Sequence, residues 1–303
     1  MQGLTKRYGD LVAVNGVSFA VNRGDIFAFL GPNGAGKTTT VEMLECLRKP
    51  TSGKAFVLGF DIAKDQMEIK KRTGVLPQDF YTYDRLTVKE TIQYYAGMFN
   101  CRPDVEGLMK LVDLEDKKKV LFRHLSGGLR QRLGIAAALV NDPEVIFLDE
   151  PSKGLDPKAR HDVWRLIDGL HKQGKTVFLT THYMEEAETL AGRVGIIHDG
   201  NIVALDSPQH LVSEYGKRNT LILKETNPKA VTNIEKLGVK ANYDETTGDI
   251  TVHLNHAVAV SEVLHSLSSS DIPFGELQLK RSSLEDVFLN LTGETLGDEE
   301  GSI

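Results

Sequence analysis

One loop of the sequence has the residue types and spacing that bind the phosphates of a nucleotide. Gly31, Gly36, Lys37 and Thr38 fall at the spacing G-x-x-x-x-G-K-[ST]. The glycines let backbone N–H groups converge on an anion at a helix N-terminus, Lys37 can reach the outer phosphates, and Thr38 can ligate Mg²⁺. We expect the cofactor to be contacted by the whole loop: Gly31, Pro32, Asn33, Gly34, Ala35, Gly36, Lys37, Thr38 and Thr39.

A pair of acids later in the chain could complete the chemistry of such a loop. Asp149 and Glu150 end the apolar run "VIFLDE". A buried strand that carries Asp149 at its C-terminal end would place a carboxylate beside the Mg²⁺. Glu150 could then act as a general base toward a water that attacks the γ-phosphate.

The elements that would position these residues follow an α/β pattern. Apolar runs predict buried strands at 26–30, 144–150 and 176–182, and helical patterns flank them. From about residue 86 to a second glycine-rich loop, "LSGG" at 125–128, the residue pattern predicts helices, and Thr87 and Glu90 have capping-box spacing. We expect exposed turns at the basic runs 69–72 and 117–119.

In the C-terminal part, the predicted strands and helices follow a different order. Strands and helices are predicted from residue 216 in the order βαββαβ, which is that of a ferredoxin-like fold, and "SLEDVFLNLTG" adds a short helix. We expect a domain at 216–293 that is a dimerisation or regulatory module. Residues 294–303 are expected to form a disordered acidic tail.

Several motifs occur in an order that resembles the ATP-binding-cassette (ABC) ATPases. "LSGG" at 125–128 is similar to the ABC signature, and "VLPQD" places Gln78 at the Q-loop. "KGLDP" places Asp156 in the D-loop, "TTH" places His182 as the switch histidine, and Tyr8 matches the aromatic residue that stacks on adenine. The resemblance covers residues 4 to about 215. It departs from the family pattern at Leu129, where Gln is frequent, and at Ser152, where Thr is usual.

The resemblance implies a P-loop NTPase cassette at 1–215 with a RecA-like mixed sheet and a helical subdomain at about 79–140. ATP and Mg²⁺ are the implied cofactors. Two cassettes would pair head to tail, as a homodimer or with a paralogue, so that the signature meets the partner's ATP in trans. The implied catalytic residues are Lys37, Gln78, Glu150 and His182, the metal ligands are Thr38, Gln78 and Asp149, and the further nucleotide contacts are Tyr8, Asp156 and the signature residues Ser126, Gly127 and Gly128.

Composition narrows the partners of such a cassette. The chain has 303 residues and a formal net charge of −6, and residues 216–303 carry 8 Lys+Arg against 14 Asp+Glu, so nucleic acid is not an expected partner. The longest apolar run, "IAAALV" at 135–140, is far shorter than the roughly 20 residues that span a bilayer, so we expect no membrane insertion.

Two segments favour one kind of ABC protein. "THYMEEAETLAGRVGIIHDGNIVALDSP" and "SLEDVFLNLTG" resemble the ATPases of drug- and sodium-efflux systems. The resemblance implies an exporter motor in the cytoplasm, held on the inner face of the cell membrane by a separate polytopic permease. The alternatives are an importer motor and a soluble ABC ATPase that acts on DNA or ribosomes.

Overall fold

The computed structural model describes residues 1–216, 219–254, 260–270, 272–280 and 282–294. The chain divides into two compact units, Met1–Gln209 and His210–Gly297. The division lies a few residues before the expected boundary at 215/216, within helix α8 (Pro208–Tyr215). Asn290 Nδ2 donates a 2.8 Å hydrogen bond to the carbonyl of Tyr215, which ties the end of α8 to the C-terminal unit. The expected disordered tail falls, from residue 295 onward, outside the described residues.

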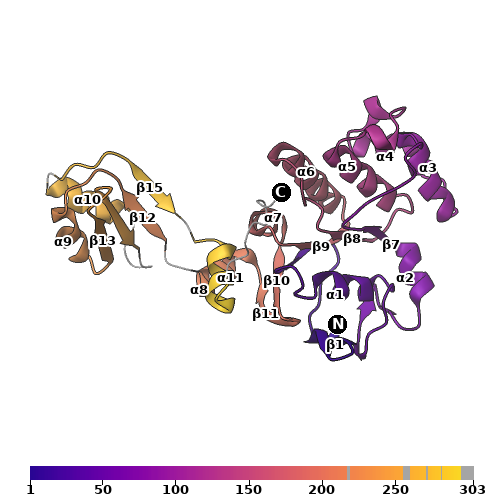
Figure 1. Cartoon of the computed structure of the whole chain (residues 1–303), viewed down its shortest axis with the longest axis horizontal. Helices are drawn as coiled ribbons and strands as arrows, with labels where there is room; N and C mark the ends of the chain where they lie inside the picture. The colour runs from indigo at the N-terminus through magenta and orange to yellow at the C-terminus, as the bar shows by residue number, and fades with distance from the viewer. Residues whose placement is uncertain (217–218, 255–259, 271, 281, 295–303) are drawn as a thin grey trace. The chain divides into compact units, whose positions relative to one another are not determined.

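A six-stranded sheet forms the centre of the first unit, in the order β11-β10-β3-β9-β8-β7 (Figure 1). The strands are β3 (Ile26–Leu30), β7 (Thr73–Leu76), β8 (Val145–Asp149), β9 (Thr176–Thr181), β10 (Arg193–His198) and β11 (Asn201–Asp206). All neighbours pair in parallel except β10 and β11, which form an antiparallel edge. Every residue of β3, β8 and β9 is buried, as expected for continuous apolar runs in a parallel sheet. The predicted mixed sheet is therefore confirmed.

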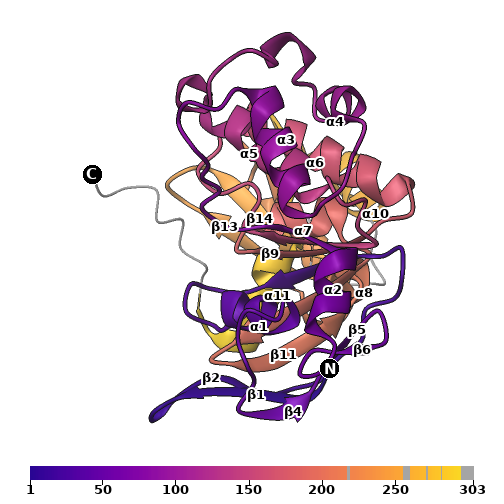
Figure 2. The same ribbon diagram turned by 90° about the vertical axis from the view of Figure 1, so that its right-hand side faces the viewer.

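A second, antiparallel layer lies on one side of this sheet (Figure 2). It has the order β2-β1-β4, formed by β1 (Gln2–Tyr8), β2 (Leu11–Val17) and β4 (Ser52–Lys54), and a small hairpin joins β5 (Phe56–Val57) to β6 (Phe60–Asp61). Four phenylalanines, Phe19, Phe27, Phe29 and Phe178, pack in a buried cluster beneath it, with ring centroids 4.8 to 6.4 Å apart.

The helices of the first unit lie on both sides of the six-stranded sheet, and Figure 2 shows α3, α4 and α5 grouped on the other side of β9 from the antiparallel layer. The helices are α1 (Lys37–Leu44), α2 (Gln66–Arg72), α3 (Val88–Met98), α4 (Val105–Leu111), α5 (Gly127–Ala138), α6 (Pro157–Lys172) and α7 (Met184–Leu190), with 3₁₀ turns at Glu115–Lys117 and Phe122–His124. The capping box predicted for Thr87 and Glu90 is present at the start of α3.

The turn expected at 69–72 was wrong. These residues end helix α2, and strand β7 follows at once. Ile69 is fully buried, so α2 has one anchored apolar position although its other residues face solvent. Pairing of Thr73 to Leu76 with β8 then makes the strand.

The C-terminal unit has the predicted order βαββαβ. Its elements are β12 (Thr220–Leu223), α9 (Lys229–Glu235), β13 (Lys240–Asp244), β14 (Asp249–His253), α10 (Val260–Ser269) and β15 (Leu277–Lys280), and α11 (Leu284–Thr292) follows. The sheet is antiparallel throughout, in the order β13-β14-β12-β15 of a ferredoxin-like fold. One face of the sheet and both helices α9 and α10 share an apolar core.

Candidate active site

The phosphate loop connects β3 to α1 and is shaped by its glycines. Helix α1 begins at Lys37, immediately after Gly36, whose φ is 103°. A Cβ at Gly36 would lie 2.3 Å from the carbonyl oxygen of Ala13, so no larger residue fits there without a shift of the backbone. The first N–H groups of α1 have no carbonyl partner within the helix and favour an anion at this end.

A cavity of about 300 Å³ opens at this loop, and it joins residues from distant parts of the chain. Parallel strands end at one edge of their sheet, so the loops that follow β3, β7 and β8 meet there. The predicted site residues that line the cavity are Pro32, Asn33, Gly34, Gly36, Lys37, Thr38, Thr39, Gln78 and Glu150. Ala13 and Lys153 also line it and were not predicted, although Lys153 stands in the "EPSKG" segment directly after the acids.

Asp149 faces the threonine of the phosphate loop. Thr38 Oγ1 lies 3.1 Å from Asp149 Oδ2, and Thr180 at the end of β9 donates a hydrogen bond to Oδ1. Burial raises the pKa of the Asp149 carboxyl, and the hydroxyls of Thr180 and Thr38 oppose that shift. The hydroxyl of Thr180 was not recognised from the sequence. Its signal would have been a polar residue at the end of a buried strand adjacent to β8.

Glu150 is buried and held by two basic side chains. Its Oε1 is 3.1 Å from Lys37 Nζ, and its Oε2 is 2.6 Å from His182 Nδ1. Burial by itself would raise the pKa of Glu150, but the hydrogen bond from His182 and the charge of Lys37 outweigh it, so the pKa lies below its ordinary value. Glu150 is therefore ionised at neutral pH. Its φ of 50° is left-handed, which turns the chain sharply after β8.

The signature residues lie apart from this cavity. Ser126 and Gly127 are exposed, and Ser126 precedes α5 without a side-chain hydrogen bond to the helix. A Cβ at Gly128 would lie 2.8 Å from the Cβ of Ala159 in α6, so this glycine permits close packing of α5 on α6. None of the three lines the cavity of the same chain.

The other predicted site residues are placed as follows. Ala35 and Gly31 are buried parts of the phosphate loop, and the carbonyl of Gly31 accepts a 2.6 Å hydrogen bond from Lys37 Nζ. Asp156 caps α6, because its Oδ1 accepts from the backbone N–H of Ala159 at 2.9 Å. Tyr8 is 39% exposed at the end of β1, with Lys6 Nζ 5.0 Å from the centre of its ring.

A buried polar group behind the acids was missed from the sequence. Glu186 is completely buried, and its Oε1 accepts hydrogen bonds from Ser152 Oγ and, at 2.8 Å, from Trp164 Nε1. Burial raises the pKa of Glu186. Glu186 stands four residues after His182, and Ser152 stands two residues after Glu150. The hydrogen bond between Ser152 and Glu186 therefore joins the segment after β9 to the segment after Glu150.

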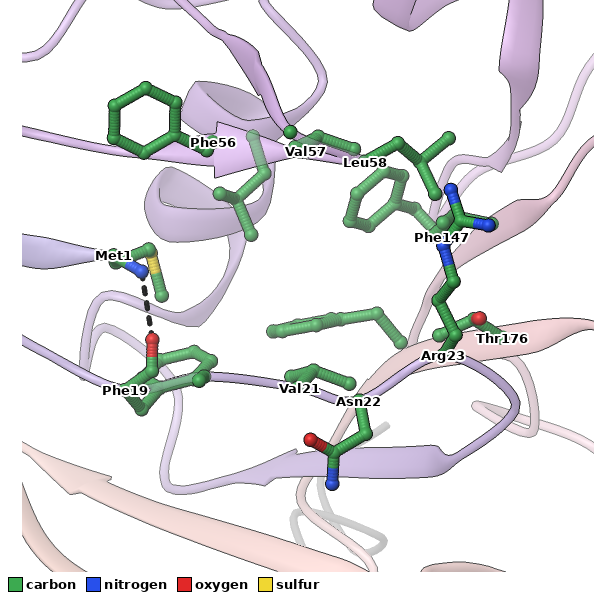
Figure 3. A pocket seen from close by; sticks show the side chains of 15 residues that line it. Met1, Phe19, Val21, Asn22, Arg23, Phe56, Val57, Leu58, Phe147 and Thr176 are labelled. Atoms are coloured by element: carbon green, nitrogen blue, oxygen red, sulfur yellow. Dashed lines mark hydrogen bonds between the residues drawn. The ribbon is translucent and has the colours of Figure 1, made fainter.

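A larger cavity elsewhere in the first unit has a different character. It has a volume of about 490 Å³ and is lined mostly by apolar side chains such as Phe56, Leu58 and Phe147 (Figure 3). Its described lining carries two basic groups: the N-terminal ammonium of Met1, which donates a 2.7 Å hydrogen bond to the carbonyl of Phe19, and Arg23, which pairs with Glu144 at 3.4 Å and is 73% exposed. Neither the phosphate-binding loop nor an acid is among the described residues that line it, so the smaller cavity is the candidate nucleotide site.

Comparison with known proteins decides the family. Residues 14–153 match the family model described as ABC transporter. The chain is 35% identical over 97% of its length, and 95% of the relative, to the daunorubicin resistance ATP-binding protein DrrA3 of Streptomyces coeruleorubidus. It belongs to the ABC transporter ATP-binding proteins.

Other relatives of this ABC protein are similar in the same way. The Nod factor export ATP-binding protein I of Ralstonia nicotianae is 37% identical, over 98% of this chain and 94% of the relative. The linearmycin resistance ATP-binding protein LnrL of Bacillus subtilis is 32% identical, over 98% of this chain and 99% of the relative. The dimeric structure of a post-hydrolysis ATP-binding cassette with ADP and Pi superposes with a TM-score of 0.61 at 27% identity, over 68% of this chain and 97% of that one.

The ABC protein is thus an ATPase with the cassette fold and an ATP-binding subunit of the exporter type. Across the described residues, no helix has both the length and the apolar character needed to cross a bilayer. In the same part of the chain, no three His, Cys, Asp or Glu side chains gather in a way that could hold a metal ion.

Proposed function

We propose that this chain hydrolyses Mg·ATP between two paired cassettes and thereby drives export through a separate membrane permease. The observation that carries the proposal is the position of Glu150. It is buried in the phosphate-loop cavity, ionised, and held between Lys37 and His182. The relatives named for resistance and export support the direction of transport.

The loop and its neighbours hold the substrate in this proposal. The phosphates bind the N–H groups of Gly31 to Thr39, Lys37 contacts the outer phosphates, and Tyr8 stacks on adenine. Mg²⁺ binds through Thr38, Asp149 and Gln78. This donor set fits Mg²⁺, which prefers oxygen ligands and is usually held by one or two carboxylates together with substrate phosphates. The ion would neutralise charge that develops on the phosphates.

In hydrolysis Glu150 takes the proton of the attacking water, and His182 orients Glu150. A water oxygen attacks the γ-phosphorus, the bond from that phosphorus to the β,γ-bridging oxygen breaks, and the products are ADP and phosphate. Glu150 accepts the proton of the attacking water. Its lowered pKa keeps the carboxylate in the basic form, and the hydrogen bond to His182 Nδ1 fixes the direction of the carboxylate.

The second cassette supplies the rest of the site. Ser126, Gly127 and Gly128 of one chain meet the γ-phosphate held by the other, where the N-terminus of α5 favours negative charge. The exposure of Ser126 and Gly127, and their separation from the cavity of their own chain, support this arrangement. Asp156 reaches the shared interface beside α6.

The permease binds at the helical subdomain in this proposal and holds the cassette on the inner face of the membrane. Exposed aromatic side chains support this surface, because isolated soluble domains rarely expose such groups together. Tyr81 and Tyr83 are 64% and 62% exposed, and the ring of Tyr83 packs edge-on against Tyr94. They follow Gln78 closely, so the permease contact and the nucleotide cavity share one segment.

The test is the mass of Glu150→Gln in solution with and without Mg·ATP. Removal of the base stops hydrolysis while ATP still binds, so the chain should shift from 33.5 kDa to a dimer of twice that mass. Lys37→Ala is the matched control, because it loses phosphate binding and should stay monomeric with ATP. A Glu150→Gln chain that binds ATP and remains monomeric would contradict pairing with a second copy.

A further inference from the structure

Within the C-terminal unit, the sheet has one face that helices α9 and α10 leave open. On the other face, side chains of the strands pack with α9 and α10, the core residues being Leu221, Leu223, Ala230, Ile234, Ala241, Ile250, Val252, Val263 and Leu267. Residues alternate between faces along a strand, so every second residue of the four strands belongs to the open face.

The strand register arranges the open face into three rows that cross the sheet. The first row is Lys240, His253, Thr220 and Lys280, which are direct partners across the four strands. The middle row is Asn242, Thr251, Ile222 and Gln278. The third row continues the same register one step beyond, with Asp244, Asp249, Lys224 and Glu276.

The outer rows carry opposite charge. With His253 neutral, the first row has a formal charge of +2 from Lys240 and Lys280, and neither lysine has an ion-pair partner within the described residues. The third row has a formal charge of −2, since three acids outweigh Lys224, which lies 2.9 Å from Glu276. On β13, β14 and β15 alike, a basic residue at one end of the face stands four positions from an acid at the other.

We propose that this open face pairs with the same face of a second copy of the chain, about a two-fold axis that runs along the middle row. With this axis between the two sheets, each strand lies over the same strand of the second chain and runs in the opposite direction. The basic row of one chain therefore lies over the acidic row of the other. A two-fold axis parallel to the strands would place like-charged rows together. Charge therefore selects one of the two face-to-face arrangements.

The open face is too small to hold two chains together by itself. Four short strands cannot bury the roughly 800 Å² per partner that a stable interface has. The contact rests on the proposed pairing of two cassettes, which tethers the C-terminal units and raises their effective concentration to about the millimolar range. The contact between C-terminal units then favours pairing with a second copy of this chain over pairing with a chain whose sheet face carries a different charge pattern.

Residues of the middle row would face their own copies, which gives a direct test. In the full-length chain, Thr251→Cys should crosslink to Thr251→Cys of the second copy with a bismaleimide whose spacer matches the about 10 Å between packed sheets. Lys240→Cys is the matched control on the same face. It should not link to itself, because four residues displace it by about 13 Å along the strand, but it should link to Asp244→Cys in a mixed sample.

The charge argument is tested on β15 in the Thr251→Cys background. Lys280→Glu should slow the crosslink about tenfold, because an acid then faces Glu276 of the second copy, and Lys280→Glu with Glu276→Lys should restore it. The unsubstituted chain corrects for the native Cys46 and Cys101. Each chain is measured without nucleotide at high concentration, and with Mg·ATP in the Glu150→Gln background.

The outcomes separate this inference from the proposed function. A Thr251→Cys crosslink that follows the charge pattern supports the inference, whether or not it needs Mg·ATP. No Thr251→Cys crosslink under any condition, or a Lys240→Cys self-link of equal rate, overturns it. If Glu150→Gln dimerises with Mg·ATP while no crosslink forms, the cassettes pair and only the contact between C-terminal units is wrong.

Discussion

Glu45, directly after α1, is a buried carboxyl in an unfavourable place. It is 7% exposed, and no hydrogen bond or ion pair reaches its carboxyl within the described residues. Burial raises its pKa from 4.5 to about 8, with further contributions from the negative charges of Asp149 and Glu42. We predict that Glu45→Gln stabilises the protein above about pH 5, because the amide has no proton that the unfolded chain releases and the folded chain must keep.

The sign and size follow from proton linkage. At low pH both the folded and the unfolded chain bind the proton, so ionisation costs nothing. Above pH 4.5 the unfolded chain releases the proton while the folded chain keeps it up to about pH 8, so the free energy of unfolding falls by about 1.4 kcal/mol per pH unit in that window. The penalty is on the order of 1 kcal/mol at pH 5 and 4 kcal/mol at pH 7.5.

The assay is denaturant unfolding of both full-length chains without nucleotide at pH 5 and pH 7.5. Glu45→Gln should gain up to about 4 kcal/mol over the parent at pH 7.5 and about 1 kcal/mol at pH 5. Glu42→Gln on the same helix is the control. It loses a partly exposed ion pair with Arg48 and the smallest of the three contributions to the raised pKa of Glu45, two effects of opposite sign, and should change stability by less than about 1 kcal/mol. An equal effect of Glu45→Gln at both pH values, or a loss at pH 7.5, would refute the reasoning.

Three further substitutions test other parts of the first unit. Trp164→Phe removes a donor to the buried Glu186 and should lower the free energy of unfolding by about 1–3 kcal/mol, measured in denaturant. Gly36→Ala would bring a Cβ within 2.3 Å of the Ala13 carbonyl oxygen. The affinity for ATP, measured by calorimetry, should therefore fall at least about tenfold. Thr87→Ala breaks the capping box of α3 and should cost about 1 kcal/mol, with the ATPase rate of the folded protein unchanged.

Much of the fold and part of the site could be predicted from local pattern. The apolar runs at β3, β8 and β9 predict buried parallel strands, and the loop from Gly31 to Thr38 predicts a phosphate site. Helix α2 and strand β7 could not be predicted in the same way. They are short, and β7 is a strand because β8 offers it a partner, which is a long-range property.

The sequence by itself determined the chemistry that this protein has available: a phosphate loop, two acids after an apolar run, a histidine after another, and a second glycine loop. These are local features, since residue type and spacing fix which groups can bind an anion or accept a proton. Only the tertiary structure decided how the groups act. Parallel pairing brings Glu150 between Lys37 and His182. Burial raises the pKa of Asp149, whereas His182 and Lys37 outweigh the effect of burial at Glu150 and lower its pKa. Burial and register depend on residues far apart in the chain, so the role of Glu45 and the charged rows of the C-terminal sheet emerge only when the strands are paired.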